Sequence, residues 1–234
     1  MFYRIADEVF EKLPDLCVGV VVARGLDNHR RYPHVAEMLH AGIAQREAYF
    51  EGKKVKEDPV ILPYREAFRA VDINPNKFLC SIEALFTRIA KKKGFPEINA
   101  IVDLGNAVSL KYGLPIGAHD LATMADGLEV RPAREGDTFL PFGGESAEIP
   151  DSGEVVYVSG GEVRTRRWTW RQSEVGKITE ETCDVLFPID GFVSVNGEAV
   201  RAAMAEFAGA LQEVFGVEAV LGFVDKDHPA FIFE

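Results

Sequence analysis

Hydrophobic residues recur at three- and four-residue steps through much of the chain, which is the spacing of an amphipathic helix. The pattern predicts a short helix or lead-in over residues 5–13 and helices over residues 33–50, 63–70, 82–92, 98–112 and 198–215. Ser81 is expected to cap the helix that starts at residue 82. Gly113 is expected to end the helix over residues 98–112.

Strand patterns show a period of two or a short continuous apolar run. The run Leu16–Ala23 predicts a buried strand, and a last strand is expected over residues 217–224. In between, alternating segments separated by Gly, Pro and Asp predict strands at Leu128–Pro132, Thr138–Pro141, Glu154–Val158, Val163–Arg171 and Val185–Pro188. Helices and strands are interleaved irregularly, so the sequence predicts a mixed α/β (α+β) fold in a single domain over residues 1–234.

Both tryptophans and three arginines lie within Arg166–Arg171. Residues 154–158 and 163–171 are expected to pair as a hairpin that turns at Ser159-Gly160-Gly161. If residues 163–171 form one strand, the side chains alternate, with Arg164, Arg166, Trp168 and Trp170 on one face and Arg167, Thr169 and Arg171 on the other. Guanidinium groups beside indole rings suit anions and flat or aromatic groups. The alternative is a surface ladder of arginines beside a partly buried tryptophan pair.

The predicted helix over residues 98–112 carries a second candidate. Asn106 shares a stripe with Asp103 and Leu110, beside the apolar packing face. A neutral amide can both donate and accept, so Asn106 suits a ligand carbonyl or hydroxyl. The alternative is a structural amide that bonds to a nearby loop.

A third candidate is the pair His119-Asp120, where a histidine next to a carboxylate invites an acid–base interpretation. Adjacent residues of an extended segment point to opposite faces, so both cannot face one ligand. Asp120 can instead cap a helical turn over residues 121–124.

The net charge of −11 opposes non-specific binding to nucleic acid, which depends on phosphate neutralisation. Any RNA contact must therefore use local basic patches: Lys53-Lys54-Val55-Lys56, Lys91-Lys92-Lys93 and the arginines of residues 164–171. The alternative for each lysine run is a solvated loop or helix end.

Cysteines and histidines give no sign of a metal or disulfide site. The three cysteines are widely spaced, and the five histidines show no HxxxH or HxH spacing. No glycine-rich nucleotide-binding motif is present either, so no cofactor is expected. The longest apolar run near the start, Leu16–Ala23, is too short to span a bilayer and lacks the layout of a signal peptide. We therefore expect a cytoplasmic protein with no membrane contact.

Seven segments, taken together and in order, resemble one family: Tyr64-Arg65, Asn74–Lys77, Ser81–Leu85, Pro96–Leu110, Leu114–Asp120, Arg131–Gly136 and Arg166–Arg171. They are similar to free-standing B3/B4 domain proteins and to the B3/B4 editing domain of the bacterial phenylalanyl-tRNA synthetase beta subunit. The likeness covers about residues 60–195 and is weaker outside them.

The resemblance implies a B3/B4-like fold with a central β-sheet flanked by helices. It also implies binding of the 3′ end of a mischarged aminoacyl-tRNA and hydrolysis of its ester in trans. Asn106 matches the asparagine of the synthetase pattern TNYV, which lines the editing pocket, and Asp120 matches the aspartate of PxHAFD.

This chain departs from the family pattern at two places. The pocket histidine of PxHAFD aligns with Gly117, and the acidic residue that reads the tyrosine hydroxyl aligns near Pro188. The comparison with the family pattern therefore implies that this chain lacks the residues with which the synthetase recognises tyrosine.

The sequence thus favours a hydrolase of mischarged aminoacyl-tRNA, with tRNA and the amino-acid moiety as partners. The expected substrate-binding residues are Asn106, Gly117, His119, Asp120, Arg166, Arg167, Trp168 and Trp170. We expect Asn106 to lie in one cavity with one face of the 163–171 strand. The rival hypothesis is a non-catalytic module that binds tRNA or an amino acid.

Overall fold

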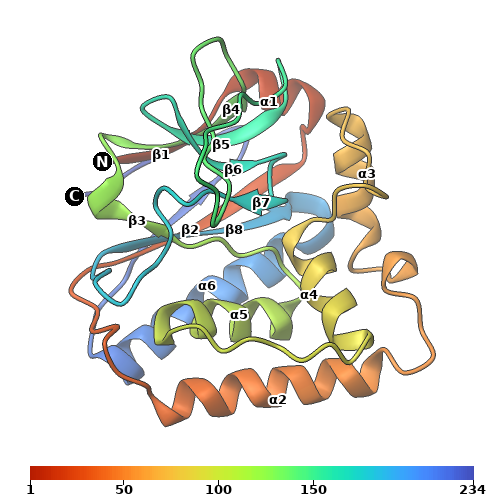
Figure 1. The fold of residues 1–234 in the computed structure, drawn as a ribbon, viewed down its shortest axis with the longest axis vertical. Coiled ribbons are helices and arrows are strands. Elements are labelled where there is room, and N and C mark those ends of the chain that lie inside the picture. Colours follow the sequence, from red (N-terminus) through yellow and green to blue (C-terminus); the bar gives the residue numbers. More distant parts are fainter.

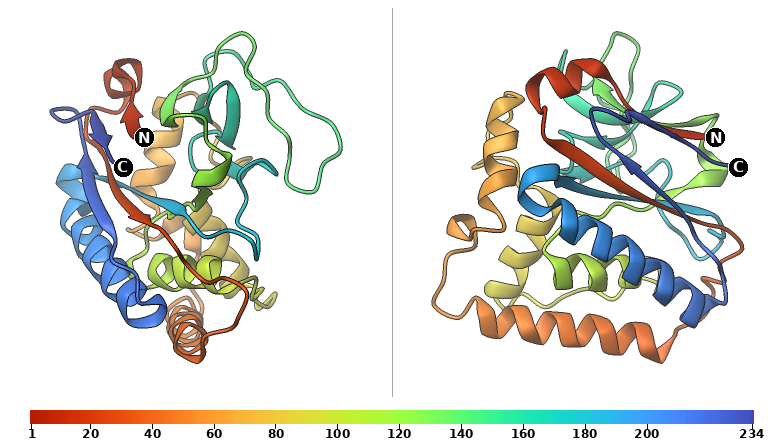
Figure 2. Two further views of the ribbon diagram at one scale, coloured as in Figure 1. Left: turned by 90° about the vertical axis from the view of Figure 1, so that its left-hand side faces the viewer. Right: turned by 180° about the vertical axis from the view of Figure 1, so that it is seen from behind.

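The computed structural model describes residues 1–234 as two β-sheets and a set of helices (Figures 1 and 2). The mixed α/β prediction is confirmed, but the strands form two sheets rather than one central sheet. The sheets face each other, and helices cover the outer face of the smaller one, as Figure 1 shows from top to bottom.

The smaller sheet has the strand order β3-β8-β2-β9. The bounds are His119–Asp120 for β3, Val185–Phe192 for β8, Leu16–Ala23 for β2 and Val220–Val224 for β9. Both faces of β2 are buried. Leu16, Val18, Val20 and Val22 belong to one hydrophobic cluster and Cys17, Val21 and Ala23 to another, as alternation in a strand between two layers requires.

The larger sheet has the order β10-β1-β4-β5-β6-β7. Its strands are Ala230–Ile232 (β10), Phe2–Ile5 (β1), Gly127–Pro132 (β4), Val155–Ser159 (β5), Glu162–Arg166 (β6) and Arg171–Gln172 (β7). The sequence pattern missed β1 and β10, which pair the two ends of the chain. The termini consequently lie side by side in Figure 1, and the Met1 amino group donates to the Phe233 carbonyl at 2.7 Å.

Six α-helices and two short 3₁₀ segments complete the fold: α1 (Asp7–Lys12), α2 (Pro33–Tyr49), η1 (Val55–Glu57), α3 (Leu62–Ala70), α4 (Ser81–Ala90), α5 (Ala100–Tyr112), η2 (Leu121–Thr123) and α6 (Val193–Phe215). α6 packs on β2 and β8, and α2 lies beneath α5 at the outside (Figure 1). None of the helices is long and apolar enough to cross a membrane.

Helix α4 starts one residue earlier than predicted. Cys80 is its N-cap residue, with no side-chain cap, so Ser81 does not cap the helix. The Ser81 amide instead donates to the Thr169 carbonyl at 2.8 Å. This bond ties the start of α4 to the tryptophan segment.

The hairpin turn was predicted correctly, but the single strand over residues 163–171 was wrong. Gly160 and Gly161 turn between β5 and β6 with positive φ, as their lack of a Cβ allows. The next two residues after Arg166 also adopt positive φ, 48° at Arg167 and 59° at Trp168. The chain reverses there and continues into β7. The predicted alternation of side chains therefore stops at Arg166.

Candidate functional site

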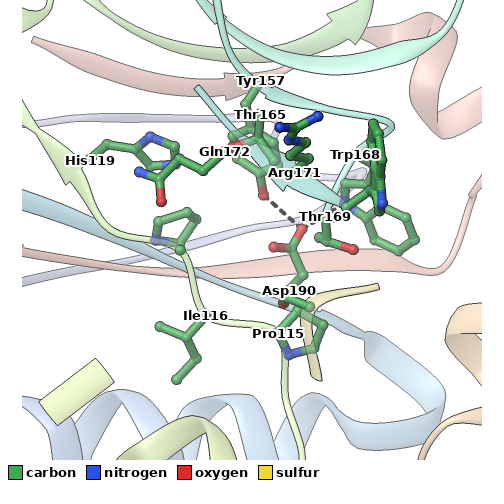
Figure 3. Close-up of a pocket in the computed structure, with 14 residues that line it drawn as sticks. Pro115, Ile116, His119, Tyr157, Thr165, Trp168, Thr169, Arg171, Gln172 and Asp190 are labelled. Atoms are coloured by element: carbon green, nitrogen blue, oxygen red, sulfur yellow. Dashed lines mark hydrogen bonds between the residues drawn. The ribbon is translucent and has the colours of Figure 1, made fainter. Parts of the chain in front are cut away.

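A cavity of about 90 Å³ opens between the two sheets and the start of α4 (Figure 3). It is lined by Ser81, Pro115, Ile116, Gly117, His119, Tyr157, Thr165, Trp168, Thr169, Trp170, Arg171, Gln172, Pro188 and Asp190. The lining comes from five stretches of chain that are distant in sequence, so folding alone assembles it.

One side of the cavity is built by residues 115–120 running antiparallel to β8. The Gly117 amide donates to the Pro188 carbonyl at 2.9 Å, and the Asp190 amide donates to the Pro115 carbonyl at 3.0 Å. Gly117 and Pro188 are thus cross-strand neighbours, and neither presents a polar side chain to the cavity.

His119 and Asp190 each lie two residues beyond this pair, in opposite directions. Residues two apart share a face of a strand, so both side chains reach the same cavity from opposite ends. His119 lies opposite Leu186, so at about 3.4 Å per residue it is roughly 14 Å from Asp190 along the strand direction. Figure 3 shows the imidazole and the carboxylate on either side of the opening.

Asp190 is the centre of a buried polar network. Its Oδ1 accepts hydrogen bonds from the Tyr157 hydroxyl and from the Trp168 indole nitrogen, each at 2.7 Å. The Tyr3 hydroxyl in turn donates to the Tyr157 hydroxyl at 3.2 Å. Tyr157 and Trp168 belong to the large sheet and its β6–β7 connection, so the network joins the two sheets.

Burial raises the pKa of Asp190 from 3.8 to about 7, and the two hydrogen bonds lower it only in part. Both bonds fall on Oδ1, which leaves Oδ2 without a partner in the protein. Oδ2 points toward the open centre of the cavity in Figure 3. A carboxyl group with a pKa near neutrality can exchange a proton under ordinary conditions.

His119 is fully buried and stacks on the Tyr157 ring, with ring centroids 5.8 Å apart. Burial, with a smaller contribution from Arg164, lowers the pKa of His119 to about 3. The imidazole is therefore neutral at physiological pH. A Cβ built on Gly117 would lie 3.2 Å from Nε2 of His119, so this ring occupies the space beside position 117.

Two residues that line the cavity carry a buried polar atom without a hydrogen-bond partner. Five buried side-chain polar atoms in the protein lack a hydrogen-bond partner, and two of them, His119 Nδ1 and Thr169 Oγ1, belong to lining residues. A buried polar group without a partner costs about 1–3 kcal/mol, so such groups are rare without a functional reason. Two residues of the cavity wall thus carry polar atoms that make no hydrogen bond within the protein.

The two tryptophans have different environments. Trp168 is completely buried and packs against Tyr64, Phe68 and Phe192 as a cavity wall. Trp170 is half-buried at the rim and meets the Phe78 ring edge-on, with centroids 4.8 Å apart. The reversal at Arg167 and Trp168 causes this difference, which a continuous strand would not produce.

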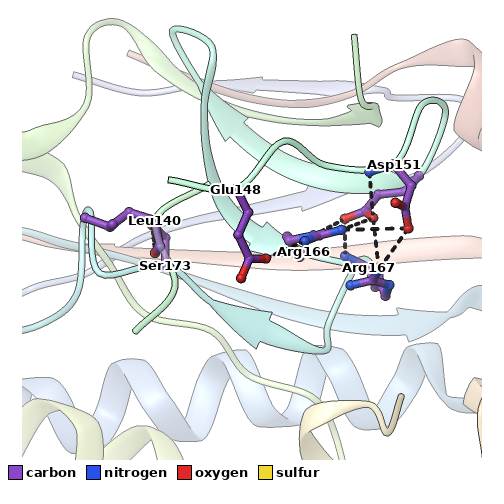
Figure 4. Close-up of polar contacts among 7 residues, drawn as sticks. Leu140, Glu148, Asp151, Arg166, Arg167 and Ser173 are labelled. Atoms are coloured by element: carbon purple, nitrogen blue, oxygen red, sulfur yellow. Dashed lines mark hydrogen bonds and ion pairs between the residues drawn. The ribbon is translucent and has the colours of Figure 1, made fainter. Parts of the chain in front are cut away.

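Arg166 and Arg167 form ion pairs with nearby carboxylates and do not line the cavity (Figure 4). Arg166 binds both carboxylate oxygens of Glu154 at 2.8 and 2.9 Å and pairs with Glu148 at 2.8 Å. Arg167 pairs with Asp151 at 2.9 Å and lies over the Phe78 ring. Arg171, which is exposed and has no ion pair, is the cavity's own cation.

The expected place of Asn106 in this cavity is wrong. Asn106 lies half-buried on α5, outside the lining, and its side chain makes no hydrogen bond in the protein. Its helix packs into the helical layer against α2 and α6, so the stripe that carries Asn106 does not face the space between the sheets. Asp120 also lies outside the cavity. It caps η2 by accepting from the Ala122 amide at 2.9 Å, and it accepts from the Thr182 hydroxyl at 2.8 Å.

The sequence pattern predicts a strand that ends at Pro188, so Asp190 falls outside it and is not among the predicted site residues. The proline is tolerated because its carbonyl bonds to Gly117, so its missing N–H faces an irregular segment rather than β2. A usable signal was present: Asp190 is the only charged residue in the apolar run Val185–Phe192. A lone carboxylate in a buried strand must be neutral or partnered.

No group of three or more His, Cys, Asp or Glu side chains is arranged to hold a metal ion.

The B3/4 domain family matches residues 63–215, well over half of the chain. The chain belongs to the B3/4 domain family. The match includes every residue that lines the cavity.

Curated relatives of this B3/4 domain protein are phenylalanine–tRNA ligase beta subunits. The one from Novosphingobium aromaticivorans is 30% identical over 125 residues, 49% of this chain and 14% of the relative. The one from Chromobacterium violaceum is 36% identical over 73 residues, 31% of this chain and 9% of the relative. The chain therefore corresponds to a small part of these subunits.

A solved structure supports the fold. An N-terminal fragment of the phenylalanyl-tRNA synthetase beta subunit from Pyrococcus horikoshii superposes with a TM-score of 0.52 at 12% identity. The superposition covers 93% of this chain and 49% of the fragment. At this identity the likeness shows a shared fold and nothing about chemistry.

At both positions where the chain departs from the family pattern, Gly117 and Pro188, a polar residue two positions away lies in the same cavity. Gly117 lacks the expected histidine, but the His119 ring lies beside it. Pro188 is not acidic, but Asp190 follows on the same face of β8 and lines the same cavity. The cavity of this B3/4 domain is therefore lined by an imidazole and a carboxylate, each two residues along the chain from one of these positions.

Proposed function

We propose that this protein hydrolyses the ester of a mischarged aminoacyl-tRNA in trans, with the aminoacyl group bound in the cavity between the sheets. The observation that carries the proposal is Asp190, whose carboxyl group has a pKa near 7 and an unpartnered oxygen at the cavity. The family relation to the beta subunits supports the choice of substrate.

The chemistry requires little more than a base and a polar cavity. An aminoacyl ester is already activated, so the protein needs to orient a water, accept its proton and stabilise the developing oxyanion. Asp190 Oδ2 would accept the proton and then pass it to the ribose oxygen that leaves when the tetrahedral intermediate collapses. The Thr169 hydroxyl, which has no partner, would donate to the oxyanion, and neutral His119 would position the substrate from the opposite end.

The cavity favours a small amino acid. Its volume of about 90 Å³ is below the roughly 150 Å³ of an engineered protein cavity that admits benzene. We therefore propose a small aliphatic or hydroxylated side chain rather than tyrosine.

The rim supplies a place for the nucleotide that carries the ester. Trp170 is half-exposed there and is held from behind by Phe78, which makes it a stacking platform for the terminal base. The exposed Arg171 beside it can contact a phosphate. Gly117, His119, Trp168 and Trp170 thus belong to the proposed site, whereas Asn106, Asp120, Arg166 and Arg167 do not.

A deacylation assay with a panel of mischarged tRNAs tests the proposal. We expect ester cleavage above background for tRNAs that carry small amino acids and none for those that carry tyrosine or phenylalanine. Asp190→Asn should reduce the rate at least about 100-fold, the usual contribution of a general base. Asp126→Asn, an exposed carboxylate at a distance from the cavity, is the matched control and should keep the rate.

The second candidate is a module that binds tRNA or an amino acid without hydrolysing it. It is favoured by the separation of His119 and Asp190, which form no hydrogen-bonded pair across the cavity. Tight binding of uncharged tRNA with no cleavage of any ester in the panel would establish this candidate and exclude the hydrolase.

A further inference from the structure

Two lysine runs that are 35 residues apart in sequence meet at one groove. The groove has a volume of about 510 Å³ and lies between the loop after α2 and the side of α4. Its lining contains Lys53, Lys54, Val55, Lys56, Arg65, Asn76, Leu79, Glu83, Thr87, Ala90 and Lys91. We call it the lysine groove.

The lysine groove has a strong local excess of positive charge in a chain whose net charge is −11. Five basic side chains and one acidic side chain line it. The acidic one, Glu83, is buried in the floor and bound to Arg65 at 2.6 Å. All four lysines are exposed, and only Lys54 has an ion-pair partner, Glu57 at 3.2 Å.

Most arginines of residues 164–171 are ion-paired, unlike most lysines of the groove. Arg164, Arg166 and Arg167 are all paired with glutamate or aspartate. Among these arginines only Arg171 has no ion pair. By contrast, three of the four lysines of the groove are exposed and without an ion pair: Lys53, Lys56 and Lys91.

Helix α4 connects the lysine groove with the cavity. Ser81, its first residue, lines the cavity, and Lys91, which follows its last residue, lines the groove. At about 1.5 Å per residue these positions are roughly 15 Å apart. A nucleic-acid strand at about 3.4 Å per stacked nucleotide spans that distance with about four nucleotides.

We propose that the lysine groove binds the phosphate backbone of the RNA strand whose 3′ end enters the cavity. This inference rests on the proposed function, because it assumes that the cavity receives the aminoacyl end. Lysines contribute point charges without base readout, and Thr87 and Asn76 offer hydrogen bonds to phosphate oxygens. The contact is therefore independent of sequence and sensitive to salt.

The test is the affinity for a 5′-labelled uncharged tRNA, measured by fluorescence anisotropy between 50 and 200 mM salt. The full chain is compared with a variant that carries Lys53→Gln, Lys54→Gln, Lys56→Gln and Lys91→Gln. A matched control changes Lys12, Lys111, Lys177 and Lys226 to Gln, which removes the same charge outside the groove.

We expect the groove variant to bind at least about tenfold more weakly at 100 mM salt, and its plot of log affinity against log salt to be flatter by about three units, since each phosphate contact contributes about 0.7. The control should stay close to wild type. Equal losses in both variants, or no loss in the groove variant, would overturn the proposal.

Deacylation separates this proposal from the function on which it rests. The groove variant should raise KM and leave kcat unchanged, whereas Asp190→Asn should lower kcat and leave tRNA affinity unchanged. Lysine-dependent tRNA binding without any ester cleavage would support the groove and refute the hydrolase. Cleavage with an unchanged KM in the groove variant would refute the groove alone.

Discussion

At the scale of single residues, two buried titratable groups define the cavity, and burial shifts them in opposite senses. The Asp190 carboxyl has its pKa raised to about 7, and the His119 imidazole has its pKa lowered to about 3. Both shifts disfavour the charged form, which is what a poorly hydrated site does to an acid and to a base. Near neutral pH the cavity therefore holds a neutral imidazole and a carboxyl group that is partly ionised.

These shifts predict opposing effects of pH on stability. Between pH 3.8 and about 7, folded Asp190 keeps a proton that the unfolded chain has lost, so the free energy of unfolding falls as pH rises. Between about pH 3 and 6.5, unfolded His119 holds a proton that the folded protein lacks, so the free energy of unfolding rises with pH. Each contribution is about 1.4 kcal/mol per pH unit, so the two largely cancel where they overlap.

Asp190→Asn removes the contribution of Asp190 to the pH dependence of the free energy of unfolding. The asparagine oxygen still accepts hydrogen bonds from Tyr157 and Trp168. Urea unfolding should therefore show the variant's stability rising between about pH 4 and 6.5 by roughly 1.4 kcal/mol per unit relative to wild type. At pH 8 the variant should be the more stable of the two. Parallel pH profiles would show that Asp190 is ionised normally in the folded protein.

At the scale of elements, the β6–β7 connection determines which aromatic and basic groups reach the cavity. Arg167 and Trp168 adopt positive φ without being glycine, a conformation that needs support from the surroundings. The support comes from Arg166 bound to Glu154, from the Trp168 amide bonded to the Val155 carbonyl at 2.6 Å, and from the Trp168 indole on Asp190.

Glu154 and Glu148 provide a matched test, because both pair with Arg166. Glu154 is 6% exposed and Glu148 is 48% exposed at the side chain. Glu154→Ala leaves a buried arginine poorly compensated and should cost about 3 kcal/mol, whereas Glu148→Ala should cost less than about 1 kcal/mol. Chemical unfolding followed by tryptophan fluorescence measures both costs; equal values would show that the buried pair does not hold the turn.

The limits of sequence reasoning are also clearest at this scale. The apolar run of β2 and the periodic helices were predicted with bounds close to the observed ones, because their own side chains specify them. β1 and β10 are short strands that exist because the two ends of the chain pair, which no local pattern encodes. The reversal after Arg166 depends on ion pairs with residues 148–154, and so the local alternation of residues 163–171 was misleading.

At the scale of the whole molecule, the cavity depends on the facing of two sheets. Asp190 comes from the small sheet, Tyr157 from the large one, and the hydrogen bond between them crosses the interface. Four residues of the Leu114–Asp120 segment and both tryptophans, all within segments that carry the resemblance, line the cavity. The resemblance could not indicate that His119 and Asp190 take the places beside Gly117 and Pro188, because side-chain positions two residues away are set by the tertiary fold.

Charge is also organised at this scale. The lysine groove and the unpaired Arg171 by the cavity lie toward opposite ends of α4, whereas Arg166 and Arg167 are neutralised by ion pairs within the protein. An RNA strand would meet repulsion over most of the surface and attraction along this path. That distribution is expected to orient the strand with its end toward the cavity.

The most direct test of the account is the rate of ester cleavage as a function of pH for a tRNA mischarged with a small amino acid. For the wild-type protein we expect kcat to rise through pH 7 and then level off, as the Asp190 carboxyl loses its proton. For Asp190→Asn we expect a rate at least about 100-fold lower with no such rise. An Asp190→Asn variant that cleaves the ester at the wild-type rate, with the same pH profile, would contradict the account.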